Sequence, residues 1–280
     1  MLKSSEISFT DKDFSFVAAM AAERYGIKIP DTKKGLLHAR IAKRIRLLGL
    51  ASMQDYMDRV SGTQGSMEQA NFLTLLTTNT TSFFREEHHF EFLKKVVFPD
   101  HSLKSGNETM RIWSAGCSHG QEPYSISATL NAHRKTDRHF RGRIDATDVD
   151  KIVLDKARTG EYEKAEMTGL SQDHAAVLFG RNAGTTCRVV DDIRQNVDFN
   201  VLNLMDNFRF DQKFDVIFCR NVVIYFGRET QVGIWDKFLQ YLKPGGYLFI
   251  GHSERLTGPA SSKFENVGRT IYRLRSDNTQ

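Results

Sequence analysis

The stretch "RIWSAGCSHGQEPYSI" (residues 111–126) decides the fold. Ile112-Trp113 closes an apolar run typical of a short strand, and Gly116 and Gly120 bracket a turn. Glu122-Pro123 then indicates a helix start, because proline is tolerated in a first turn and a carboxylate is favoured there. This order of elements brings the backbone of an α/β fold close to a nucleotide-like ligand. An ordinary strand-to-helix connection has the same pattern, and the absence of Gly-Lys-Ser/Thr argues against a phosphate cradle.

Short apolar runs alternate with helical patterns along the rest of the chain. Runs such as Val216-Ile217-Phe218 are typical of strands buried on both faces of a sheet. We therefore predict an α/β domain over residues 111–280, with a mostly parallel sheet and helices on both faces. The segment at about 160–196 is long for one crossover, so we expect a small β insertion there, with a helix and a short hairpin.

The first part of the chain has a different pattern. Residues 1–78 read as helices, with Gly26 and Gly49 at expected helix ends, and predict an all-α domain. Residues 79–110 read as a linker and helix. The chain has 280 residues, 40% of them hydrophobic, and no apolar run near the roughly 20 residues that span a bilayer. Without a signal-like N-terminus, and with three widely spaced cysteines, it fits a cytoplasmic protein that is not inserted in a membrane.

Positive charge is concentrated in residues 31–46, "DTKKGLLHARIAKRIR". Six cations stand there against one aspartate, and six minus one equals the formal net charge of +5 for the whole chain. Apolar residues at helical spacing define a buried stripe of Leu37, Ile41, Ile45 and Leu48. The cations are either a solvated face or a docking surface for an acidic partner. The predicted docking residues are Lys33, Arg40, Lys43, Arg44 and Arg46.

Polar residues follow the predicted strands where each one ends. Ligands of open α/β sheets bind outside the carboxyl ends of the strands, so these residues are candidates for one site. They are Gly116, Gly120 and Glu122 after the first strand, Asp148 after the second, Asn203 and Leu204 after the third, and Arg220, Asn221 and Tyr225 after the fourth. A carboxylate ending the second strand could accept hydrogen bonds from both hydroxyls of a ribose. Asp148 is also a candidate N-cap for the helix that follows.

Two further segments narrow the class of protein. "YLKPGGYLFIGHSE" (residues 241–254) places Lys-Pro-Gly-Gly between a helix and a strand, which resembles the fifth-strand signature of class I S-adenosylmethionine-dependent methyltransferases. "LLTTNTTSFFREEHHFEFL" (residues 75–93) has a plain reading as a capped helix with core phenylalanines. Arg85 among those phenylalanines is nevertheless costly unless it has a partner.

Together with "SAGCSHGQEPYSI", "ATDVDKIVLDKARTGEY" and "CRNVVIYF", these segments closely resemble the chemotaxis receptor methyltransferases, the CheR family. The resemblance covers nearly the whole chain. It implies methyl transfer from S-adenosylmethionine to glutamate side chains of chemoreceptors, with release of S-adenosylhomocysteine. By motif match, the cofactor-binding residues would be Asn79, Thr81, Arg85, Gly116, Glu122, Asp148, Asn203, Leu204, Arg220 and Asn221. Arg85 and Tyr225 would lie nearest the methyl group.

The resemblance also implies partners. Acidic methylation helices of chemoreceptors would dock on the basic helix and recruit the enzyme to membrane receptor arrays. In some members the β insertion binds a pentapeptide at receptor C-termini, but "GRNAGTTCRVV" (residues 180–190) looks shorter here, so this tether is in doubt. We expect a monomer. We expect no metal, because the nine histidines show no ligand spacing, and His88, His89 and His119 read as packing or surface residues.

Two rival functions remain open. A nucleic-acid methyltransferase would also explain the basic helix, but "CRNVVIYF" stands where an Asn/Asp-Pro-Pro-Tyr/Phe element would be expected. A non-catalytic adapter that binds acidic helices is the second rival. It would have no need of the motif residues Arg85, Asp148 and Tyr225.

Overall fold

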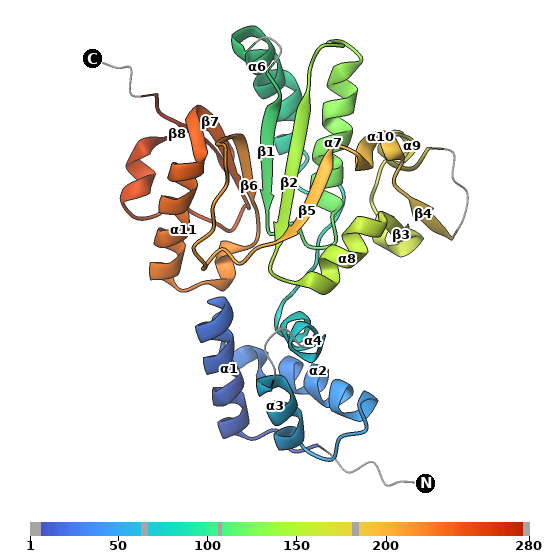
Figure 1. Cartoon of the computed structure of the whole chain (residues 1–280), viewed down its shortest axis with the longest axis vertical. Coiled ribbons are helices and arrows are strands. Elements are labelled where there is room, and N and C mark those ends of the chain that lie inside the picture. Colours follow the sequence, from blue (N-terminus) through green and yellow to red (C-terminus); the bar gives the residue numbers. More distant parts are fainter. Residues whose placement is uncertain (1–6, 63–66, 106–107, 181–184, 277–280) are drawn as a thin grey trace. The chain divides into compact units, whose positions relative to one another are not determined.

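The computed structural model describes residues 7–62, 67–105, 108–180 and 185–276 (Figure 1). They form two compact units. The first comprises the chain up to Asn79 together with Tyr225–Gly227, and the second comprises Thr80–Ile224 and the chain from Arg228 onward. Among the described residues no helix is both long and apolar enough to span a membrane.

The first unit is helical, as the sequence predicts. Its elements are α1 (Asp11–Tyr25), η1 (Asp31–Lys33), α2 (Lys34–Leu47), α3 (Met53–Ser61) and α4 (Met67–Leu76). A capping box of Thr10 and Asp13 begins α1, and Gly26 ends it with a φ of 69° that favours glycine. The predicted stripe on α2 is confirmed at Leu37, Ile41 and Ile45, which are buried. Leu48 is only half-buried because it lies beyond the last residue of α2.

Two of the predicted docking cations are used inside the first unit. Arg44 on α2 donates from Nε and Nη2 to the two carboxylate oxygens of the buried Glu68 on α4, at 3.0 and 2.7 Å. Arg40 donates to the carbonyls of Leu75 and Thr77 at the end of α4, at 2.8 and 2.9 Å. The prediction that these two guanidinium groups are offered to a partner is therefore corrected: they join α2 to α4.

The second unit is built on a seven-stranded sheet of order β5-β2-β1-β6-β7-β9-β8. Its first five strands in this order are parallel, and the pairs β7–β9 and β9–β8 are antiparallel. The strands are β1 (Met110–Ala115), β2 (Gly142–Asp148), β5 (Val197–Val201), β6 (Phe214–Cys219), β7 (Leu242–Ile250), β8 (Phe264–Gly268) and β9 (Ile271–Leu274). The sequence reading missed β8, a strand with exposed polar side chains at the edge of the sheet.

Helices cover both faces of this sheet. Ile112 of β1 belongs to a core that includes Leu130 of α7, whereas the next residue, Trp113, packs edge-on against Phe238 of α11 at 5.2 Å between ring centroids. Successive strand residues point to opposite faces, so α7 and α11 lie on opposite sides. The helices of the unit outside the insertion are α5 (His88–Phe92), the π-helical η2 (Leu93–Val97), α6 (Phe98–Ser105), α7 (Gln121–Arg134), α8 (Lys151–Thr159), η4 (Val223–Tyr225, whose last residue belongs to the first unit), α11 (Arg228–Tyr241) and η5 (Pro259–Lys263).

The expected insertion contains a hairpin and a helix. Antiparallel strands β3 (Glu161–Glu163) and β4 (Thr186–Arg188) flank η3 (Lys164–Met167) and α9 (Gln172–Phe179), and α10 (Asp191–Arg194) leads back to the sheet (Figure 1). Part of the loop on which the tether prediction depends, residues 181–184, lies outside the described residues.

The Lys-Pro-Gly-Gly segment differs from the prediction. Helix α11 ends at Tyr241, before this segment, and β7 already begins at Leu242 with a register shift opposite Phe214–Val216. Gly246 is required because a Cβ there would lie 2.9 Å from the carbonyl oxygens of both Asp215 and Lys243. Gly246 therefore allows two backbones to approach closely, and Gly245, with a φ of 77°, turns the chain within the irregular start of β7.

Replacing Arg44 by alanine should destabilise the first unit. The change leaves the buried Glu68 carboxylate unpaired, which costs about 3 kcal/mol. We expect a lower urea midpoint for this unit in the full chain and faster amide hydrogen exchange in α2 and α4. The matched control is Arg46→Ala on the exposed side of the same helix, with an expected change within about 0.5 kcal/mol. Equal losses in the two variants would contradict the structural role of Arg44.

Candidate functional site

The loop after β1 is held against the loop after β6. Gly116 has a φ of +87°, and a Cβ on it would lie 2.3 Å from Cγ2 of Val222. No other residue type fits without movement, so the first glycine of the opening motif is explained by this close approach. Gly120, with a φ of 92°, precedes α7 and completes the turn.

Asp148 ends β2 and is held by the neighbouring loop. Its Oδ2 accepts a hydrogen bond from the backbone N–H of Ser118 at 2.8 Å, and its Oδ1 accepts one from that of Asp150 at 3.0 Å. The N-cap of α8 is Asp150, whose carboxylate accepts from Ile152 and Val153. The alternative reading of Asp148 as that cap is therefore wrong. Burial raises the pKa of Asp148 to about 6, against the lowering effect of its backbone hydrogen bonds.

Glu122 lies in the first turn of α7 and faces a buried cation. Ser114 donates its hydroxyl to one carboxylate oxygen at 2.7 Å, and Nη1 of Arg220 lies 3.3 Å from the other. Burial raises the pKa of Glu122, whereas Arg220 and Ser114 act in the opposite direction. The carboxylate and Arg220 thus form a buried ion pair at the carboxyl end of the sheet.

Arg220, directly after β6, also organises the segment that carries Arg85. Its side chain is 2% exposed, its guanidinium donates to the carbonyl of Arg85, and Nη2 lies 3.8 Å from Glu86. Although burial opposes it, Arg220 together with His252 holds the pKa of Glu86 below its ordinary value. Phe84, next to Arg85, donates its backbone N–H to the hydroxyl of Ser125 on α7.

These contacts leave the guanidinium of Arg85 in a half-exposed position, where it donates to the carbonyl of Thr80 at 3.2 Å. The neighbouring residues Phe84 and Glu86 both have positive φ, at 51° and 57°. Such conformations are uncommon for side chains of this size and persist where the surroundings impose them. The structure therefore presents Arg85 on a tight, restrained turn.

Glu254 is a site residue that the sequence reading did not single out. Its carboxylate, 2% exposed, accepts hydrogen bonds from the backbone N–H groups of Gly251, Asn221, Val222 and Val223 at 2.5 to 3.0 Å. Burial raises its pKa, against the effect of these hydrogen bonds. It is the glutamate of "GHSE", so the motif contained the signal. Its role, however, depends on a contact with Asn221, which lies 33 positions earlier in the sequence.

This carboxylate shapes the loop that carries Asn221. Asn221 has a φ of 59°, and its side-chain oxygen Oδ1 is buried without a hydrogen-bond partner among the described residues. A buried acceptor without a donor is unfavourable and therefore points to a group that would donate to it. Its predicted neighbour Asn203, after β5, accepts from the N–H of Met205 and donates to Asp206, and Leu204 is buried.

Not all predicted residues lie in one unit. Thr81 is half-buried in the second unit, whereas Asn79 and Tyr225 belong to the first. Their roles stay predictions. The two terminal guanidinium nitrogens of Arg220 contact Glu122, Glu86 and the Arg85 carbonyl, whereas its Nε is buried without a hydrogen-bond partner among the described residues.

Two further groups of polar side chains occur in the second unit. Glu86, His88 and His89 each offer one possible metal-ligand atom, all within 4.8 Å of one another. His89 is fully buried, contacts the Arg269 carbonyl and Thr270 hydroxyl through Nε2, and packs against Phe249. Burial lowers the pKa of His89 to about 2. This agrees with a packing role for His89, and the expectation of no metal stays a prediction.

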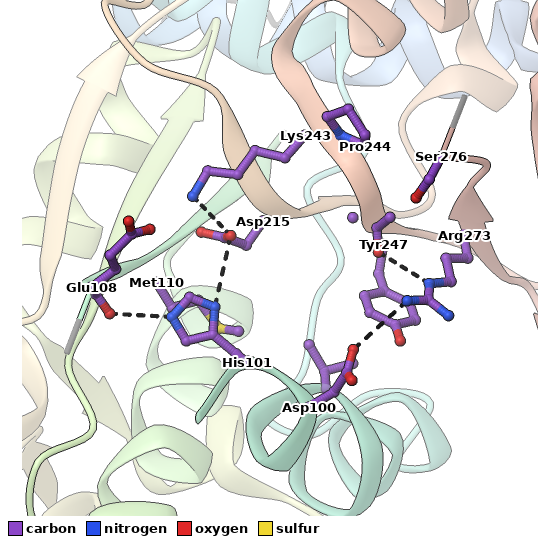
Figure 2. Close-up of a pocket in the computed structure, with 13 residues that line it drawn as sticks. Asp100, His101, Glu108, Met110, Asp215, Lys243, Pro244, Tyr247, Arg273 and Ser276 are labelled. Atoms are coloured by element: carbon purple, nitrogen blue, oxygen red, sulfur yellow. Dashed lines mark hydrogen bonds and ion pairs between the residues drawn. The ribbon is translucent and has the colours of Figure 1, made fainter. Parts of the chain in front are cut away.

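A cavity of about 500 Å³ lies where β1, β6 and β7 begin, at the opposite strand ends from Asp148 and Glu122. Figure 2 shows Lys243 and His101 pointing toward Asp215, with distances of 2.9 and 3.7 Å to its Oδ1. Arg273 lies 3.7 Å from Asp100. Charges of opposite sign thus meet within this cavity and link α6 to the sheet.

Comparisons with known proteins agree with the two units. A family model described as the CheR methyltransferase all-alpha domain matches residues 12–77, and one described as the CheR methyltransferase SAM binding domain matches residues 79–273. A probable chemotaxis protein methyltransferase of Rhizobium etli is 42% identical over 253 residues, covering 89% of this chain and 94% of that protein. The chemotaxis protein methyltransferase of Escherichia coli is 38% identical over 275 residues, covering 97% of this chain and 93% of that protein.

Replacing Glu254 by glutamine should loosen the loop after β6. The amide group turns two donor hydrogens toward backbone N–H groups, so at least one buried donor loses its acceptor at a cost of about 1–3 kcal/mol. We expect lower thermal stability of the second unit and faster hydrogen exchange at Asn221–Val223. Glu265→Gln, on the exposed edge strand β8, is the control and should change neither. Unchanged exchange at Asn221–Val223 in Glu254→Gln would contradict the role of the carboxylate.

Proposed function

The chain belongs to the CheR methyltransferase family, and on this premise we propose that it methylates glutamate carboxylates of chemoreceptors, using S-adenosylmethionine as the methyl donor. It is an S-adenosylmethionine-dependent methyltransferase of chemotaxis. The observation that carries the proposal in structural terms is Asp148 at the end of β2, held beside the glycine loop of β1.

The residues at the carboxyl ends of the strands fit the donor. The Asp148 carboxylate offers oxygens to the two hydroxyls of a ribose, and Asn221 offers its unpartnered Oδ1 to a donor group. The absence of a side chain at Gly116 lets the loop after β1 approach Val222 in the loop after β6. We assign Asn203 and Leu204 to the adenine, through their backbone groups, and Glu122 to the amino-acid end. Thr81 and Asn79 would complete the cofactor contacts.

The reaction itself requires no general base. A glutamate carboxylate is already ionised at neutral pH. When bound, S-adenosylmethionine supplies a methyl group on a positively charged sulfur, so opposite charges are neutralised as the methyl is transferred. Water stabilises the separated charges more than the transition state, and a site that excludes water and fixes the approach of the carboxylate should accelerate the step. The burial of Cys117 raises the pKa of its thiol, which disfavours the nucleophilic thiolate.

Arg85 and Tyr225 are the residues that we assign to the acceptor. The guanidinium of Arg85 is half-exposed, and the one hydrogen bond described for it goes to a carbonyl, so it can also bind a carboxylate. Arg220 already neutralises Glu86 and Glu122 nearby, and Arg85 is therefore not required as their partner. We propose that Arg85 orients the acceptor glutamate and that Tyr225 restricts its approach.

The docking surface is smaller than the sequence suggested. With Arg40 and Arg44 engaged inside the first unit, the exposed cations of the predicted set are Lys43 and Arg46, whereas Lys33 is half-buried and lies over the ring of Tyr225. Such charges raise the rate at which an acidic helix associates, with a strong dependence on salt. We propose a cytoplasmic, monomeric enzyme that is recruited to membrane receptor arrays and binds receptor helices here.

Asp148→Asn tests the ribose contact through pH. The carboxylate must be ionised to accept both hydroxyls, and its pKa is raised to about 6 in the free protein. Affinity for S-adenosylmethionine should therefore be constant above this pH and fall as the pH is lowered through it, by up to tenfold per unit. Asp148→Asn should weaken binding about 10- to 100-fold at neutral pH, because hydrogen bonds to a charged group are lost, and should remove the step near pH 6.

Calorimetric titration from pH 5 to 8 measures this effect. Asp155→Asn, an exposed residue of α8, is the control and should keep the wild-type profile. If Asp148→Asn binds with wild-type affinity, or keeps the pH step, the ribose assignment is wrong.

Arg85→Ala tests the acceptor assignment. Loss of a charged hydrogen bond to the carboxylate should lower kcat about 10- to 100-fold, while the affinity for S-adenosylmethionine falls much less. The assay transfers labelled methyl from S-adenosylmethionine to receptor-containing membranes, and mild alkali then releases methanol from carboxyl esters. Arg209→Ala, an exposed arginine of the same unit, should leave the rate unchanged.

The rival functions give different results in the same assay. Label that stays on protein in alkali would contradict glutamate esterification, and label on nucleic acid would support the nucleic-acid enzyme. Tight binding of S-adenosylmethionine with no transfer to any acceptor would favour the adapter.

A further inference from the structure

The segment Tyr225–Gly227 leaves the second unit and belongs to the first. The short helix η4 (Val223–Tyr225) crosses this boundary, because Val223 and Ile224 belong to the second unit and Tyr225 to the first. The chain returns to the second unit at Arg228, where α11 begins. A residue assigned to methyl transfer is thus held by the helical unit.

Three contacts within the first unit hold this segment. The backbone N–H of Lys28 donates to the carbonyl of Tyr225 at 2.7 Å, and Ile27 forms an antiparallel bridge with Phe226. Ile27 is itself fixed, being buried and donating its N–H to the carbonyl of Ala21 on α1. The backbone of Tyr225 is therefore anchored to the end of α1.

The third contact fixes the aromatic ring. Nζ of Lys33 lies 5.2 Å from the ring centroid of Tyr225, over its face. A lysine ammonium at this distance is attracted by the negative face of the ring. Tyr225 is half-buried, so the ring would have other rotamers available without this cation.

We propose that the helical unit positions Tyr225 for methyl transfer, with Lys33 as the positioning residue. The proposal rests on the proposed function, which assigns Tyr225 to the acceptor, and adds that the helical unit contributes to kcat as well as to docking. Lys33 directly precedes the basic helix α2 in the sequence, but its role differs from that of Lys43 and Arg46. A docking cation changes the association rate and the receptor KM, whereas a cation that holds the Tyr225 ring changes kcat.

Lys33→Ala in the full chain should lower kcat about two- to fivefold, the factor that corresponds to a cation–π contact of this kind. The receptor KM and the affinity for S-adenosylmethionine should stay at their wild-type values. Lys33→Arg should restore kcat to within about twofold, because a guanidinium also binds the ring face. Initial rates of labelled methyl transfer to receptor-containing membranes, at several receptor concentrations, separate kcat from KM.

A double-mutant cycle makes the test specific for Tyr225. In a Tyr225→Phe background, which keeps the ring, Lys33→Ala should cause the same loss as in the wild type. In a Tyr225→Leu background, measured by single-turnover labelling, it should cause none. Lys12→Ala, an exposed cation of α1, is the control and should leave kcat unchanged.

An effect of Lys33→Ala confined to receptor KM, or an equal effect in the Tyr225→Leu background, would overturn the proposal. Thermal unfolding of each variant identifies any loss caused by misfolding, and Lys33→Arg, which keeps a cation at this position, then still tests the proposal through its expected recovery of kcat. Failure of the proposed function looks different, because the wild-type protein itself would then label no receptor.

Discussion

The buried guanidinium of Arg220 is the constraint on which the candidate site depends. A charge with 2% of its side chain exposed is stable only with close anionic and carbonyl partners, and Glu122, Glu86 and the Arg85 carbonyl supply them. These partners come from the start of α7 and from the segment before α5, while Arg220 itself follows β6. One side chain therefore determines how three segments, distant in sequence, meet at the carboxyl edge of the sheet. Because Glu86 and Glu122 are paired with Arg220, Arg85 is not needed as their counter-ion.

Carboxylates that accept backbone N–H groups then fix the loops around this ion pair. Asp148 holds the loop after β1, and Glu254 holds the loop after β6 through four backbone donors. Loops immobilised in this way lose little conformational entropy when a ligand binds. The positive φ of Asn221 is maintained by the same network, since its own N–H is one of the donors to Glu254.

Local patterns in the sequence were sufficient to predict the sheet and the position of Asp148. Buried runs such as Val216–Phe218, and a glycine turn before a helix, are properties of consecutive residues. The pairing of Arg44 with Glu68, and of Glu254 with the loop after β6, joins residues 24 and 31 to 33 positions apart, so no local pattern reveals it. Charge alone made Arg40 and Arg44 look like docking residues. The polar strand β8 was missed because its burial pattern is that of an edge.

The sequence also offers no local pattern from which to predict that Tyr225 belongs to the helical unit, because the residues on either side of Tyr225–Gly227 belong to the unit that contains the sheet. Its backbone anchors to Lys28 and Ile27 do not depend on the identity of those side chains, whereas its ring contact depends on the charge of Lys33. The segment's backbone is thus held by hydrogen bonds that most substitutions preserve, and the orientation of the ring by one cation. The contact between Lys33 and Tyr225 is therefore the part of this anchoring that a single side-chain substitution can remove.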